Sequence, residues 1–81
     1  MKIELRFFAL YRETVGKEQI EMEVKEGTTP AHVWRELCQD FPKLVDQSDT
    51  WKVAVNGEYV DPDFTLREGD ELTFIPPLSG G

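Results

Sequence analysis

The chain has 81 residues, which is the size of one small domain and leaves no room for a second domain of typical size. Sixteen acidic and nine basic residues give a formal net charge of −7, which disfavours nucleic acid and anionic membranes and favours a basic partner. One cysteine, Cys38, permits no intramolecular disulfide, and no apolar run is long enough for a membrane span or signal peptide, so we expect a cytoplasmic protein.

Residues 2–25 predict two strands joined by a short connection. Residues 2–9 and 18–25 alternate apolar and polar side chains, the period of a strand with one buried face. Residues 10–17, which include Gly16, are typical of a turn or a short helical piece. A connection this short favours an antiparallel pairing of the two strands.

A helix is predicted to begin at Pro30. Thr28 and Thr29 are candidate N-caps, and proline is tolerated at the first helical position. An apolar stripe at helical spacing follows, formed by Pro30, Val33, Trp34, Leu37, Cys38 and Phe41. Pro42 ends the pattern, and the polar residues 43–50 predict a surface loop.

The remaining residues predict three short strands. Residues 51–55 and 58–60 flank Asn56-Gly57, the strongest short hairpin signal, and residues 71–75 alternate again after turns at 61–63 and 67–70. The order of elements predicts an α+β domain with a mixed sheet packed on one main helix. This order is compatible with the ubiquitin-like β-grasp layout.

The C-terminal residues 76–81 are the most informative stretch. Pro76 and Pro77 stop the last strand, and the sequence then ends on Gly80-Gly81. We expect a domain over residues 1–76 and a flexible, extended tail over 77–81. Because glycine has no Cβ atom, the tail could carry its terminal carboxylate into a narrow pocket of another protein.

Several motifs together resemble the small, sulfur-carrying subunit of molybdopterin synthase, a MoaD-like member of the ubiquitin-like β-grasp proteins. The resemblance runs nearly end to end. It rests on Phe7-Phe8-Ala9, Arg12-Glu13, Val15-Gly16, Ala54-Val55-Asn56, Leu66, Gly69-Asp70-Glu71, Phe74, Pro76-Pro77 and Ser79-Gly80-Gly81. Ile75 departs from the phenylalanine that the family often has there, which bears on partner choice and not on chemistry.

The resemblance implies a function for the tail. A ubiquitin-activating-like enzyme would use ATP to adenylate Gly81, and a cysteine desulfurase or rhodanese-type donor would supply the sulfur of a terminal thiocarboxylate. The tail residues Leu78, Ser79, Gly80 and Gly81 would then enter the large subunit of molybdopterin synthase, where sulfur passes to cyclic pyranopterin monophosphate to form the dithiolene. The family association implies a heterotetramer of two small and two large subunits. The chain itself would bind no cofactor or metal, and it would not be catalytic alone.

A docking surface is predicted beside the tail. If Ile3, Leu5, Phe7, Val53, Val55, Val60, Leu72 and Phe74 face the helix, alternation places Phe8, Tyr59 and Ile75 on the outer face of the sheet. Such apolar side chains next to Pro76 and Pro77 indicate a partner interface.

Other chemistry-bearing residues have simpler interpretations. Cys38 lies in the helical stripe and is expected to pack in the core, and His32 is expected to be a solvated helix residue. Acidic residues of the last third do not reproduce the spacing of a calcium loop and are expected to form a solvated surface. They are Asp61, Asp63, Glu68, Asp70 and Glu71.

Three other functions stay open from the sequence. A sulfur carrier for thiamine synthesis or tRNA thiolation would use the same tail with another partner. A ubiquitin-like modifier would join Gly81 to a lysine of a target protein. A plain interaction domain would not need Gly80 and Gly81 at all.

Overall fold

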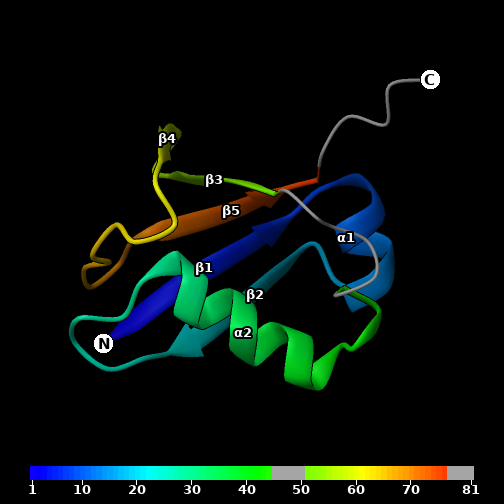
Figure 1. Ribbon diagram of the computed structural model, residues 1–81, viewed down its shortest axis with the longest axis horizontal. Coiled ribbons are helices and arrows are strands. Elements are labelled where there is room, and N and C mark those ends of the chain that lie inside the picture. The colour runs from blue at the N-terminus through cyan, green and yellow to red at the C-terminus, as the bar shows by residue number, and fades with distance from the viewer. Residues whose placement is uncertain (45–50, 77–81) are drawn as a thin grey trace.

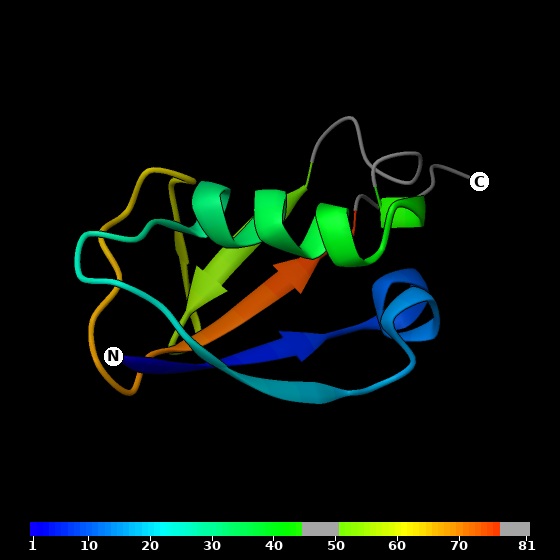
Figure 2. The same ribbon diagram turned by 90° about the horizontal axis from the view of Figure 1, so that it is seen from below.

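The computed structural model describes residues 1–44 and 51–76. They form a five-stranded sheet with a long helix across one face and a short helix at one end (Figures 1 and 2). The elements are β1 (Lys2–Phe7), α1 (Ala9–Val15), β2 (Gln19–Glu23), α2 (Pro30–Asp40), β3 (Lys52–Val55), β4 (Glu58–Val60) and β5 (Glu71–Ile75). The predicted α+β class with a mixed sheet on one main helix is confirmed.

The sheet has the strand order β2-β1-β5-β3-β4. Strands β1 and β5 are parallel neighbours at its centre, and the other three pairings are antiparallel. The hairpin of β1 and β2 is therefore confirmed. Asn56 and Gly57 both have positive φ, as the turn predicted between β3 and β4 requires.

Helix α2 begins as the sequence predicts. The Thr29 side chain accepts a hydrogen bond from the His32 N–H, and Pro30 occupies the first turn. Val33 and Leu37 are buried, while Trp34 and Cys38 are partly buried against the core.

The core lies between α2 and the inner face of the sheet. Its buried members from the strands include Ile3, Leu5, Phe7, Val53, Val55, Leu72 and Phe74, as the alternation predicts. Val60, predicted to face the helix, packs against this core but is only partly buried. Tyr11, Val15 and Leu66 complete the core from outside the strands.

Several details differ from the sequence prediction, and β2 (Gln19–Glu23) is shorter than the predicted residues 18–25. Strand β1 ends at Phe7 rather than at residue 9, because Ala9 has a φ of 49° and Phe8 is the N-cap of α1. The predicted surface loop over residues 43–50 is wrong at Leu44, which is fully buried and whose N–H donates to the Phe41 carbonyl. Residues 45–50 lie outside the described part.

Candidate functional site

The end of β5 is the place from which the predicted tail departs. Figures 1 and 2 show that the C-terminal end of the central strand β5 lies at the same end of the sheet as α1. Pro76 is the last described residue and is partly exposed. Pro77, Leu78, Ser79, Gly80 and Gly81 lie outside the described residues, so the division into a domain and a tail stays a prediction.

Aromatic side chains on the inner face hold the end of β5 in place. The ring centroid of Phe74 lies 5.0 Å from that of Trp34 and 5.2 Å from that of Trp51. The two tryptophan rings are stacked at 5.1 Å, and Tyr11 of α1 lies 5.1 Å from Trp34. Offset and edge-on rings at these spacings are favourable contacts, so the base of the tail rests on a packed cluster.

The outer face of the sheet, opposite α2, carries the three residues predicted to dock a partner. Tyr59 is 70% exposed, Phe8 is 46% exposed, and Ile75 is partly buried. Phe8 is not a strand residue, which corrects its expected position. Its ring nevertheless lies 6.0 Å from the guanidinium carbon of Arg6, which alternates with the inward Leu5 and Phe7 and thus faces outward.

Sequence reasoning missed part of this face. Ala54 and Thr73 are Cα partners on neighbouring strands and point outward, yet they are only 8% and 9% exposed. Their low exposure means that neighbouring atoms cover these small side chains. Leu10 of α1 is 45% exposed and adds apolar surface near Phe8 in the chain.

We call the outward surface of the sheet next to the end of β5 the docking face. Its residues are Arg6, Phe8, Lys52, Ala54, Tyr59, Thr73 and Ile75. It joins exposed aromatic rings and two cations beside the predicted exit of the tail. A surface that exposes large aromatic side chains in this way suits a protein partner.

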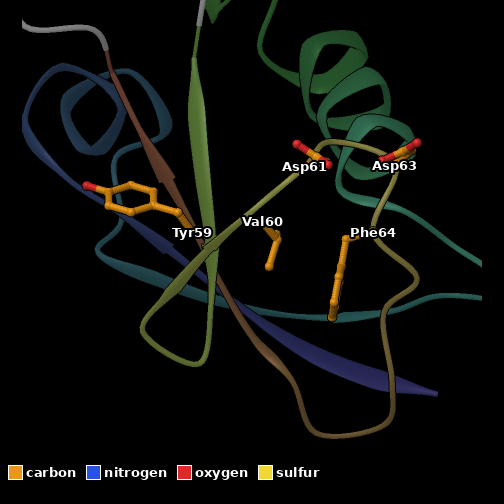
Figure 3. Close-up of a pocket in the computed structure, with 5 residues that line it drawn as sticks. All are labelled: Tyr59, Val60, Asp61, Asp63 and Phe64. Carbon is orange, nitrogen blue, oxygen red and sulfur yellow. The ribbon is translucent and has the colours of Figure 1, made fainter.

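A separate hollow lies at the β4 edge (Figure 3). It has a volume of about 520 Å³ and is lined by Tyr59, Val60, Asp61, Asp63 and Phe64. Figure 3 shows Tyr59 on one side of β4 and Val60 with Phe64 on the other. Within residues 1–44 and 51–76, no group of three acidic, histidine or cysteine residues is arranged to hold a metal ion.

The acidic residues of the last third are not all solvated. Asp70 is 9% exposed, and its carboxylate accepts hydrogen bonds from the Arg67 N–H at 2.8 Å and from Asn56 Nδ2 at 3.0 Å. The expectation of a solvated surface is therefore wrong for Asp70, whose side chain instead closes the turn that begins at Arg67. Asp61, Asp63 and Glu68 are exposed.

The other singled-out residues lie where they were expected. Cys38 packs against the core, and burial raises the pKa of its thiol above the usual value. His32 is exposed on α2. No helix in the described part of the chain is long and apolar enough to cross a membrane.

Comparison with known protein families identifies the family of this chain. The model of the ThiS family matches residues 5–81. The chain belongs to the ThiS family. Its match reaches the terminal glycines, which carry the predicted chemistry.

Curated relatives resemble the whole chain. It is 35% identical to the molybdopterin synthase sulfur carrier subunit of Chlamydomonas reinhardtii, with all of both chains covered. It is 34% identical to the subunit of the same name from Mycobacterium tuberculosis, covering all of this chain and 99% of that one. Small archaeal modifier protein 3 of Haloferax volcanii is also 34% identical, again with both chains fully covered.

Solved structures agree on the ubiquitin-like β-grasp fold. A putative subunit 1 of molybdopterin converting factor from Pyrococcus furiosus has a TM-score of 0.85 at 28% identity, covering 96% of this chain and 99% of that one. The small archaeal modifier protein 1 of Haloferax volcanii has a TM-score of 0.84 at 27% identity over the full length of both chains. The predicted fold is thus confirmed.

Proposed function

We propose that this chain is the sulfur carrier subunit of a molybdopterin synthase. The observation that carries the proposal is the full-length relationship to subunits of that name, together with a match to the family through Gly81. The partner is the large subunit of the synthase. The outer face supports this, because Ile75 at the end of β5 is the Cα partner of Lys52, whose ammonium lies 5.9 Å from the ring of the exposed Tyr59.

The chemistry follows from the terminal carboxylate. Resonance and negative charge make the Gly81 carboxylate a poor electrophile, so an ATP-dependent partner enzyme forms an acyl-adenylate and releases pyrophosphate. A persulfide of the donor protein then attacks the adenylate and displaces AMP, and a second thiol cleaves the resulting acyl disulfide by forming a disulfide with the donor cysteine, which leaves a thiocarboxylate. That sulfur passes to cyclic pyranopterin monophosphate inside the large subunit, and ATP is bound by the activating enzyme rather than by this chain.

The residues divide into two roles. Leu78, Ser79, Gly80 and Gly81 form the segment that enters the partner, where the glycines give clearance for the backbone. The interface around the entry is made by Phe8, Tyr59, Ile75, Pro76 and Pro77. Burial of each large apolar side chain against the partner would contribute about 1.5 to 3 kcal/mol.

The test is the intact mass of the chain after incubation with ATP, a ubiquitin-activating-type enzyme and a sulfur donor. A gain equal to the exchange of one oxygen for sulfur is expected, and a variant lacking Gly81 should show none. Conversion of cyclic pyranopterin monophosphate after addition of the large subunit then identifies the pathway. Absence of the mass gain with a demonstrably active enzyme would reject the carrier function.

A second function is favoured by one specific observation. The 34% identity to a small archaeal modifier protein over both full lengths supports a role in which Gly81 is joined to a lysine of a target. This role predicts covalent adducts of the tagged chain in cell lysate supplied with ATP. A carrier of another thiolation pathway would gain sulfur in the mass assay but would not bind the large subunit.

A further inference from the structure

Two cations lie on the docking face of a strongly acidic chain. Arg6 and Lys52 belong to β1 and β3, the two strands that flank β5. Lys52 is the Cα partner of Ile75, and Arg6 is the Cα partner of Thr73. The whole chain has nine basic and sixteen acidic residues. Two of the nine basic residues therefore lie on the strands next to the C-terminal half of β5.

Each cation lies over an exposed aromatic ring of the same face. The guanidinium carbon of Arg6 is 6.0 Å from the centroid of Phe8, and the ammonium nitrogen of Lys52 is 5.9 Å from the centroid of Tyr59. A cation over a ring face is attracted by the negative charge of the π system. Both side chains remain partly open to water, so their charges are available to a partner.

The sign of the charge changes along the strands. One step farther from the end of β5, three outward carboxylates are Cα partners in a row across β2, β1 and β5, namely Glu21, Glu4 and Glu71. Arg6 lies 3.7 Å from the Glu71 carboxylate, at the boundary. The face therefore has a positive end at the base of the tail and a negative end beyond it.

We propose that Arg6 and Lys52 determine which protein the docking face accepts. This inference rests on the proposed function and names the chemistry of the partner. The large subunit presents an apolar patch to Phe8, Tyr59 and Ile75, and it carries two carboxylates at the edge of that patch, one opposite each cation.

Arg6 and Lys52 discriminate between partner surfaces through the cost of burying their charges. A partner with a purely apolar surface would bury Lys52 without an opposite charge and Arg6 with no carboxylate beyond Glu71, and desolvating such cations is unfavourable. A partner with carboxylates at those two places replaces the lost water with charge-assisted contacts. The same two residues therefore favour one surface and reject another, which is how specific interfaces exclude wrong partners.

The experiment is a calorimetric titration of the full-length chain with the purified large subunit. The variants are Arg6→Gln, Lys52→Gln and the double variant. Arg35→Gln on α2 and Lys25→Gln after β2 are matched controls, because both side chains are exposed and lie away from the docking face. Each control removes the same charge as its docking-face counterpart.

Each docking-face variant is expected to raise Kd about tenfold and the double variant about a hundredfold, while the controls stay within about twofold. The conservative variants Arg6→Lys and Lys52→Arg keep the charge and should retain most of the affinity. Added salt should weaken binding of the unchanged chain more than that of the double variant. Thermal unfolding of every variant separates a loss of binding from a loss of fold.

Two results would overturn the inference in distinguishable ways. If Arg6→Gln and Lys52→Gln bind as tightly as the two controls, the cations do not determine the partner, although the chain remains a synthase subunit. If the unchanged chain gains sulfur but does not bind the large subunit at all, the proposed function fails and this inference fails with it.

Discussion

Replacement of Asp70 by alanine tests whether a buried hydrogen-bond network holds the sheet together. One carboxylate oxygen of Asp70 accepts from the Arg67 N–H at 2.8 Å, and the other accepts from Asn56 Nδ2 at 3.0 Å. Asn56 Oδ1 in turn accepts from the Glu71 N–H at 3.0 Å. The network therefore ties the turn between β3 and β4 to the start of β5.

The size of the effect follows from the two donors left without a partner. Each costs about 1 to 3 kcal/mol when it is fully buried, and less where water can reach it. Since Asp70 is 9% exposed and Asn56 lies in an exposed turn, we expect a loss of about 2 to 3 kcal/mol in the free energy of unfolding. For a domain of this size that corresponds to a fall of about 10 to 20 °C in Tm.

Thermal and urea unfolding, followed by circular dichroism, measure this loss. Asp63→Ala is the matched control, because it removes an exposed aspartate from the loop after β4 and should change stability by less than about 0.5 kcal/mol. A double-mutant cycle with Asn56→Ala should give a coupling energy of about 1 kcal/mol. Equal stability of Asp70→Ala and Asp63→Ala, or strict additivity with Asn56→Ala, would refute the reasoning.

Three further predictions concern the core and the main helix. Burial raises the pKa of the Cys38 thiol, so the folded protein favours the protonated form. Its contribution to the free energy of unfolding is present at neutral pH and is lost as pH rises, because the thiol of the unfolded chain deprotonates first. Iodoacetamide should therefore react more slowly with the folded than with the urea-unfolded protein. Equal rates would contradict this prediction. Phe74→Ala should lower the free energy of unfolding by about 3 to 5 kcal/mol and change the fluorescence of Trp34 and Trp51, on which Phe74 packs. An unchanged urea midpoint would show that this aromatic cluster does not stabilise the fold. Thr29→Ala should cost about 1 kcal/mol in thermal unfolding and Thr29→Ser close to none, so equal losses would show that the cap bond does not contribute.

The strands and the main helix could be predicted because their signals are local. Alternation identified the inward residues of β1, β3 and β5, and the capping residue with Pro30 located the start of α2. Leu44 could not be recognised as a core residue, because it is one apolar side chain in a polar run and its burial depends on distant elements. The short helical piece within residues 10–17 is confirmed by α1, which Gly16 ends, and only its first residue differs, because Ala9 adopts a positive φ that few non-glycine residues adopt.

The docking face was predicted only in part, for a related reason. Its apolar members follow from alternation within single strands. The burial of Ala54 and Thr73 depends on β3 and β5 being neighbours and on their register. Sequence periodicity carries no information on register between strands far apart in the chain, so this feature needed the structure.

The residues that carry the family resemblance are, in good part, residues that hold the fold. Asn56 and Asp70 form the network described above, and Gly69 turns with a positive φ while its N–H donates to the Lys2 carbonyl. A sulfur carrier subunit at 35% identity and a modifier protein at 34% identity are consequently almost equally similar to this chain. Overall identity therefore reports the shared fold more than the choice of partner. That choice depends on the side chains that the fold leaves exposed, and so binding measurements on Arg6 and Lys52 separate the candidate functions better than further comparison of whole sequences.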